Sequence, residues 1–333
     1  TSYSQTSSGT AFRLGFAITE YVTFGTRYSL VLDNITLDKD IFFRDPDFVD
    51  PDGTGPLPPT NGPEPLQCDP DLAGQYLCDE LGKRITSSVG YSLVFNNTNG
   101  VRPTRGQAVV LSQDFAGLGG EVRYVRSRFS GTKYWGFGGG WVFSARAEGG
   151  YIHPLEKSPG PFRDAIRITD RFFGTQLRGF DIRGIGPRIL RENYDDDGET
   201  VTDEDRVSDA LGGRAYYMGR IELELPTSSS LRSFGLRPSA FVDVGSVWGL
   251  KSPELNDLPG ICSITTGTGS STTTRQEDLA PGQTRSDCAA VLGVDPSSTI
   301  NFLPGFRERF VGNSPKPRLS VGIGVNWVSP FGP

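Results

Sequence analysis

The arginine best placed to form an ion-pair site is Arg178, in the short motif Leu177-Arg178-Gly179-Phe180. Two segments of strongly alternating polarity flank this motif and the polar stretch after it, which continues to about Asp209. Each flanking segment carries acidic residues on the side opposite its apolar residues. A guanidinium enclosed by protein needs carboxylates within reach of paired hydrogen bonds. The pattern predicts a loop that folds against the polar inner face of a sheet, where Arg178 ties it to carboxylates.

A second group with possible chemistry is an acidic run that fits the spacing of a calcium loop. Asn193, Asp195, Asp197, Gly198 and Glu204 occupy positions 1, 3, 5, 6 and 12 of the EF-hand pattern, with Asn in place of the first Asp. A solvated acidic loop has the same composition, and no helical pattern flanks this one. Calcium is therefore the one cofactor that the sequence suggests, and a solvated loop is the alternative.

The residues needed for catalysis are scarce. His153 is the only histidine, and no Gly-x-Ser-x-Gly segment supplies a nucleophile for a Ser-His-acid triad. The glycines between residues 136 and 140 lack the Lys-Ser/Thr pair and the following helix of a phosphate-binding loop. We therefore expect a protein that is not an enzyme, in which His153 lies on the surface.

The chain has 4 cysteines, which fall in polar stretches rich in Pro or in Ser and Thr. An even number in such loops predicts disulfides and an oxidising compartment. Of the three possible pairings, closeness in sequence favours Cys68 with Cys78 and Cys262 with Cys288. A zinc site is the alternative, but there is no CxxC motif and only one histidine.

The composition of the 333 residues favours strands over helices, because glycine, phenylalanine and tyrosine are abundant while methionine and histidine are rare. The mean hydropathy is -0.32, and no apolar run reaches the 18 residues of a transmembrane helix. A transmembrane β-barrel tolerates such low hydropathy because its interior face is polar. The net charge of -6 argues against nucleic-acid binding, which needs a basic face.

Segments of alternating polarity recur along the chain, and most are long enough to cross a bilayer as tilted strands of about 9–11 residues. They lie near residues 11–18, 22–32, 85–95, 107–115, 119–130, 138–152, 214–225, 236–244 and 318–327. A water-soluble sandwich would alternate in the same way. The period of two alone therefore does not distinguish the two folds.

The connections between these segments do distinguish them. The three long connections, at about 35–83, 153–209 and 250–314, are all even-numbered, so all of them leave the sheet on one side. Long loops outside and short turns inside are typical of outer-membrane barrels. Trp141, Trp248 and Trp327 lie near segment ends, where an interfacial girdle of aromatic residues would place them.

The motif at Arg178 resembles the loop motif of the BamA family of outer-membrane protein assembly factors, which also includes two-partner secretion translocators and organellar relatives. Further matches follow in the order of the family along essentially the whole chain: Pro103-Thr104-Arg105-Gly106, Ile185-Gly186-Pro187, Gly212-Gly213, Glu222, Phe241-Val242-Asp243-Val244-Gly245 with Trp248, and Trp327-Val328-Ser329-Pro330-Phe331-Gly332-Pro333. The family usually has two glycines and a longer spacer before the motif, whereas this chain has only Gly174.

This resemblance implies that Arg178 folds into a barrel lumen and pairs with Glu222 and Asp243, which the alternation also places on the polar face. It implies an all-β fold: a transmembrane antiparallel up-and-down β-barrel of about sixteen strands with long extracellular loops. Residues 1–333 would hold about nine of these strands, as an incomplete C-terminal barrel domain without periplasmic repeats. By the same resemblance, about five strands would precede Ser8 and two would follow Pro333. Since two open edges in lipid leave backbone groups unpaired, we expect that this fragment does not fold alone.

The function implied by the resemblance is non-enzymatic insertion and folding of other β-barrel proteins in the bacterial outer membrane, through a barrel that opens laterally. The expected partners are unfolded outer-membrane proteins, membrane lipids and accessory lipoproteins, with no nucleic acid. The long loops would be extracellular and the short turns periplasmic. Two alternatives are a translocator that threads an unfolded protein through its pore and a passive porin that conducts solutes.

Overall fold

The computed structural model describes residues 3–39, 43–44, 67–68, 73–100, 103–199, 201, 207–227, 235–268 and 271–327. Its main element is a sheet of nine strands in which sheet neighbours are antiparallel. In sheet order these strands are β1 (Tyr3–Ala17), β2 (Val22–Leu37), β5 (Gly82–Asn96), β6 (Gly106–Ala116), β7 (Tyr124–Phe137), β8 (Trp141–Pro154), β11 (Ala215–Glu224), β12 (Leu236–Trp248) and β16 (Arg318–Trp327). The predicted all-β, antiparallel, up-and-down arrangement is confirmed.

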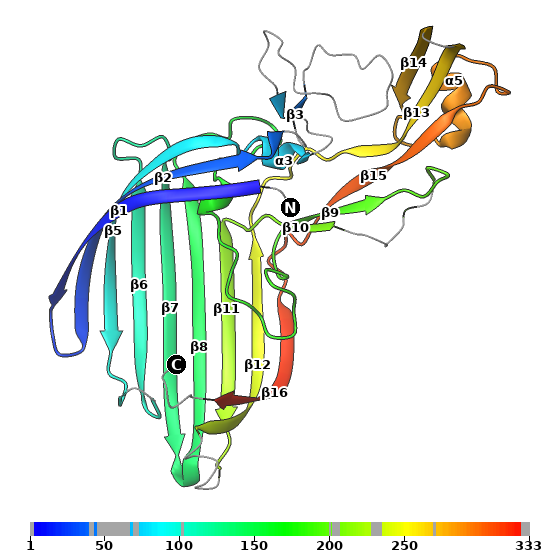
Figure 1. The fold of residues 1–333 in the computed structure, drawn as a ribbon. Helices are drawn as coiled ribbons and strands as arrows, with labels where there is room; N and C mark the ends of the chain where they lie inside the picture. The colour runs from blue at the N-terminus through cyan, green and yellow to red at the C-terminus, as the bar shows by residue number, and fades with distance from the viewer. Residues whose placement is uncertain are drawn as a thin grey trace.

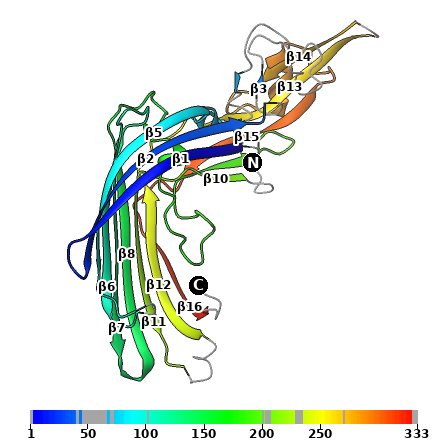
Figure 2. The same ribbon diagram turned by 60° about the vertical axis from the view of Figure 1, so that its left-hand side comes forward.

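The sheet is a strongly curved wall whose strands run side by side (Figures 1 and 2). The strands β1 and β16 lie at its two ends, and within the described residues each pairs with one other strand of the sheet. The wall has a concave side, along which the connection between β8 and β11 runs (Figure 2). Among the described residues, no helix has both the length and the apolar character needed to span a bilayer.

Successive side chains alternate between the two faces of this wall, as a strand geometry requires. The outer face carries large apolar residues that are exposed, among them Phe12, Leu14, Leu30, Val89, Leu93, Phe129, Ile221, Val321 and Ile323. The inner face carries charged residues, and Asp114, Glu148 and Asp243 are buried there. An exposed apolar band of this extent is typical of a surface that faces lipid.

A second sheet is built from the long connections, where the sequence predicts only loops. It has five strands in the order β10 (Val207–Ala210), β9 (Arg188–Asn193), β15 (Asn301–Val311), β13 (Asp257–Thr268) and β14 (Ser271–Asp278). Beside it lie η3 (Arg285–Asp287) and α5 (Cys288–Leu292), and Figure 1 shows this sheet standing beyond one end of the wall. The predicted loops at 153–209 and 250–314 therefore contain paired strands.

Two disulfides join the cysteines as closeness in sequence suggests. Cys262 of β13 is bonded to Cys288 of α5, and both are buried in the small core of the second sheet. Cys68 of β4 (Gln67–Cys68) is bonded to Cys78 of α3 (Gln75–Cys78), and β4 pairs with β3 (Phe43–Arg44). Most of the predicted loop at 35–83 lies outside the described residues.

Several strand boundaries differ from those that the alternation predicts. The strand β1 begins at Tyr3 rather than at residue 11, because polar residues continue the pairing with β2. The strand β7 covers 124–137 rather than 119–130. The segment 138–140 forms the short turn η1 (Gly138–Gly140) before β8, with Gly139 and Gly140 at positive φ. His153 lies within β8, where it is exposed, rather than at the start of a loop.

The tryptophans predicted for a girdle do lie at strand ends. Trp141 is the first residue of β8, whereas Trp248 and Trp327 are the last residues of β12 and β16. The closing segment 328–333, which carries part of the family resemblance, lies outside the described residues.

Candidate functional site

The site at Arg178 begins with the path of the segment that carries it. After β8 the chain passes through η2 (Ile168–Asp170), runs along the concave face of the wall and returns into β9 (Figure 2). Leu177 is buried in a cluster with Ile185, Met218 and Val247, so the apolar side of the loop packs against β11 and β12. The glycines at 174 and 179 have φ values of 73° and 80°, a left-handed conformation that places a turn on each side of Arg178.

Arg178 makes paired hydrogen bonds to Asp243 on the inner wall. Its Nε donates to Oδ2 at 2.8 Å and its Nη2 donates to Oδ1 at 2.7 Å. The remaining nitrogen, Nη1, donates to Oε2 of Glu222 at 3.3 Å. The guanidinium carbon lies 3.3 Å from the centroid of the Phe241 ring, which supports the group from one side. All three nitrogens and one face of the guanidinium are therefore engaged.

Asp243 is the centre of this arrangement and has no exposed surface. Besides Arg178 it accepts two hydrogen bonds from Arg220, from Nε and Nη2 at 3.0 Å each. Arg220 and Asp243 are direct cross-strand partners in β11 and β12, so the sheet register itself creates this pair. One buried carboxylate thus lies between two arginines, which lowers the cost of burying it.

Glu222 is fixed by residues of β12, the next strand of the sheet, and of β16, the strand after it. Its Oε1 accepts hydrogen bonds from Ser239 Oγ and Asn326 Nδ2, at 2.7 Å each. These residues lie on β12 and β16, so Glu222 links three strands while its other oxygen accepts from Arg178. The four charged groups Arg178, Arg220, Glu222 and Asp243 sum to zero net charge.

A further contact attaches the loop to β8. Thr175 donates a hydrogen bond through Oγ1 to Glu148, which also pairs with Arg146 at 3.1 Å. Glu148 is buried on the inner face of the wall. The loop near Arg178 is therefore connected by polar contacts to β8, β11 and β12.

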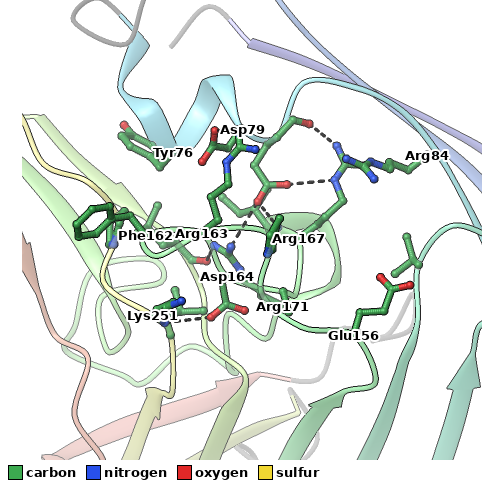
Figure 3. A pocket seen from close by; sticks show the side chains of 18 of the residues that line it. Tyr76, Asp79, Arg84, Glu156, Phe162, Arg163, Asp164, Arg167, Arg171 and Lys251 are labelled. Atoms are coloured by element: carbon green, nitrogen blue, oxygen red, sulfur yellow. Dashed lines mark hydrogen bonds and ion pairs between the residues drawn. The ribbon is translucent and has the colours of Figure 1, made fainter.

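The first part of the same connection is held at the end of the wall from which the long connections leave. A pocket of about 250 Å³ lies there, lined by residues from α3, β5, the β6–β7 turn and the segments 156–171 and 250–253. Figure 3 shows Arg163, Asp164, Arg167 and Arg171 lying close together in it. We call this charged group, together with Asp79 and Glu80, the rim cluster.

Glu80 is the buried acid of the rim cluster. It accepts hydrogen bonds from Arg167 Nε at 3.2 Å, from the backbone N–H of Ile168 at 3.0 Å and from Arg171 Nη2 at 3.4 Å. Burial raises the pKa of Glu80, and the two arginines oppose this change. Burial likewise lowers the pKa of Arg171. The connection between β8 and β11 is thus fixed twice, at the rim by Glu80 and at the inner wall by Asp243.

The structure brings together Arg178, Glu222 and Asp243, whereas it describes only part of the predicted calcium loop. Asn193 is the last residue of β9, Asp195 and Asp197 lie in the turn after it, and Glu204 lies outside the described residues. In the part of the chain that can be inspected, no three His, Cys, Asp or Glu side chains are grouped as a metal site would require. Calcium binding stays a prediction.

Sequence reasoning missed Arg220, Phe241 and the rim cluster as parts of the site. Arg220 precedes Glu222 by two residues, so the period of a strand would have placed it on the same face. The contacts of Glu80 with Arg167 span 87 residues, and nothing local in either segment indicates them.

The chain matches the Omp85 superfamily domain over residues 1–333. It is 32% identical over 181 residues to the outer membrane protein assembly factor BamA of Neorickettsia risticii (strain Illinois), which is 54% of this chain and 21% of that protein. The crystal structure of BamA from Haemophilus ducreyi lacking POTRA domains 1-3 is similar in fold, with a TM-score of 0.50 and 17% sequence identity. That match covers 96% of this chain and 55% of the other, so this chain spans little more than half of that relative.

Proposed function

The chain belongs to the Omp85 superfamily, and we propose that it forms part of an outer-membrane β-barrel that inserts and folds other β-barrel proteins. The observation that carries this proposal is the loop bound inside the curved wall, with Arg178 held by Asp243 and Glu222. The relative from Neorickettsia is an assembly factor, which supports the same reading. The proposed partners are unfolded outer-membrane proteins, lipids and accessory lipoproteins.

The bound loop suggests which part of the barrel stays rigid and which part opens. Arg178 and Glu222 connect the loop to β11, β12 and, through Asn326, β16, so this part of the wall behaves as one unit. A seam elsewhere in the barrel would then open while this unit keeps its shape. An opened seam presents an unpaired strand edge, on which a client strand can pair by β-augmentation. The folding free energy of the client drives insertion, so the barrel needs neither a nucleotide nor a catalytic group.

We also propose the placement of the chain in the membrane. Residues 1–333 would contribute the nine-stranded wall to a larger C-terminal barrel domain. The side with the second sheet and the rim cluster would be extracellular, and the short turns, such as 138–140, would be periplasmic. The loop in the lumen argues against a wide solute pore, because it occupies space on the concave side of the wall.

Reconstitution of the intact protein into liposomes tests the function. An unfolded outer-membrane protein is added outside, and its folding is followed by the mobility shift of folded barrels in unheated gels. We expect folding several-fold faster than in protein-free liposomes and unchanged when nucleotide is left out. Arg178→Ala should abolish most of this acceleration. Arg183→Ala should keep it, because Arg183 is an exposed arginine of the same loop and contacts Phe173 instead.

The same preparation separates the two alternatives. Recovery of the client inside the liposomes rather than in their membrane would indicate a translocator. A large steady conductance in planar bilayers, with no acceleration of folding, would indicate a porin. Either result would overturn the proposed assembly function.

A further inference from the structure

The outer face of the wall, on the side away from Arg178, has a shallow apolar hollow of about 420 Å³. Its floor is one row of small residues that are direct cross-strand neighbours, Gly131 of β7, Ala147 of β8 and Gly219 of β11, and the Phe129 ring lies against Gly131. Larger side chains bound this row at both ends: Val109 of β6 lies opposite Gly131, and Val244 of β12 lies opposite Gly219. The hollow therefore crosses several strands within the apolar band.

A lysine lies beside this hollow on the same outward face. Lys133 of β7 is two residues from Gly131, toward the turn at 138–140, and Gln107 of β6 lies directly opposite it. Within the fully described strands β6, β7, β8 and β11, Lys133 is the only Lys, Arg, Asp or Glu at an outward-facing position. Its Nζ lies 5.3 Å from the centroid of the Trp135 ring, and none of the ion pairs found among the described residues includes it.

The energetics of such a lysine indicate where its charge must lie. A lysine on the lipid-facing side of a barrel is strongly destabilising at the bilayer midplane but costs little near the interface. Trp135, Phe137 and Trp141 are exposed at this end of β7 and β8, where an interfacial girdle belongs. The ammonium group lies by Trp135, so it points toward the headgroups and away from the hydrocarbon.

We propose that Lys133 and the hollow together bind one glycerophospholipid. Lys133 holds the phosphate, Gln107 donates a hydrogen bond to the same headgroup, and one acyl chain lies over Ala147 and Gly219, beside the Phe129 ring that lies against Gly131. Charge complementarity selects this occupant, because the hollow itself is apolar and Lys133, the one outward-facing cation beside it, has no carboxylate partner among the described residues. The proposal rests on the membrane placement given above, which makes this the periplasmic leaflet.

The size of the expected effect follows from the charge. A lysine near a membrane surface contributes about 1 kcal/mol toward an anionic headgroup, which corresponds to about fivefold in retention. The acyl chain gains dispersion contacts with the floor and walls that a flat surface does not offer. A side chain that fills the floor should remove those contacts without touching the inner face.

Native mass spectrometry of the intact protein in detergent, titrated with dioleoyl phosphatidylglycerol, tests the proposal. We expect one lipid to stay bound to the wild type, and Lys133→Met to lower its retention about fivefold. Lys133→Arg should restore retention, and Ala147→Leu should lower it. Dioleoylglycerol, which lacks the phosphate, should bind more weakly and be insensitive to Lys133→Met.

Two matched variants serve as controls. Lys83→Met removes the lysine two residues before the outward-facing Ile85, and Ala240→Leu enlarges a small outward residue of β12 outside the hollow. Neither should change retention. Equal retention in wild type, Lys133→Met and Ala147→Leu would overturn the proposal, as would equal losses in the controls or a co-purified protein that displaces the lipid. Client folding is measured separately, so a failure of the assembly function is distinguishable from a failure of this site.

Discussion

Arg178 and Asp243 are joined by two parallel hydrogen bonds of 2.8 and 2.7 Å, although 65 residues separate them in the sequence. Such a two-pronged pair fixes both the distance and the orientation of the loop relative to β12. Asp243 also accepts two hydrogen bonds from Arg220. Its negative charge therefore reduces the electrostatic repulsion between the guanidinium groups of Arg178 and Arg220. The inner wall therefore depends on this acid more than on Glu222.

The two acids of the site should differ in their effect on stability. We expect Asp243→Asn to lower the free energy of unfolding by about 3 kcal/mol, because it removes the buried carboxylate that two partly buried arginines share. Glu222→Gln should cost about 1 kcal/mol, since the one amide oxygen can still accept from Arg178 while the amide NH2 donates to the hydroxyl of Ser239. Urea titrations followed by the mobility shift of folded barrels measure both. Equal losses would contradict the central place of Asp243.

The rim cluster should be separable from the inner-wall site. Glu80→Gln removes the charge that Arg167 and Arg171 share. We expect it to lower the free energy of local opening by about 1–3 kcal/mol. We expect faster amide hydrogen exchange over residues 163–171, with protection near Arg178 unchanged. Glu121→Gln is the control, because Glu121 lines the same pocket but, among the described residues, accepts only from the backbone of Ile85. Loss of protection throughout the loop would show that the two attachments act as one.

The disulfide between Cys262 and Cys288 should stabilise the second sheet alone. Its sequence separation is 26 residues, and a closed loop of this size contributes about 3 kcal/mol. A double Cys→Ser variant at 262 and 288 should lose exchange protection in β13 and β15 while the nine-stranded wall keeps its own. The corresponding variant at Cys68 and Cys78 should leave β13 protected. Unfolding of the wall in the first variant would refute this independence.

A tyrosine of the second sheet gives a pH-dependent signal. Burial and the hydrogen bond to Asp257 raise the pKa of Tyr194 from 10.0 to about 12. Because the pKa is higher in the folded state, the stability that Tyr194 contributes is complete below pH 10 and is lost as the pH rises through about 12.

The tyrosinate absorbance difference between the wild type and Tyr194→Phe measures this titration. Asp257→Asn should lower the pKa of Tyr194 only in part, because burial is the larger cause. A titration of Tyr194 at its ordinary pKa in the wild type would show that the hydroxyl is neither buried nor held by Asp257.

The period of two in the sequence predicts the wall well, because lipid on one side and a polar interior on the other impose that alternation on each strand. It also places Glu222 and Asp243 on the inner face, and the family resemblance adds their pairing with Arg178. The strand ends are predicted less well, since β1 continues through polar residues that the pattern does not mark.

The second sheet and the rim cluster depend on contacts that no local pattern encodes. Gly260 and Pro304, which face each other in β13 and β15, interrupt the alternation that would have indicated strands. The rim cluster joins the α3–β5 region to the connection after β8 through Glu80 and Arg167. Such contacts form only once the wall has brought its connections together at one end.

A double-mutant cycle on the free energy of unfolding, with Arg178→Ala, Asp243→Ala and both changes together, tests the bound loop most directly. We predict a coupling energy of about 2 kcal/mol between the two residues, because each single change removes the paired hydrogen bonds and leaves Asp243 with Arg220 alone or Arg178 with Glu222 alone. A coupling below about 0.5 kcal/mol, the value for independent sites, would contradict the account, since the loop would then not be held at Asp243.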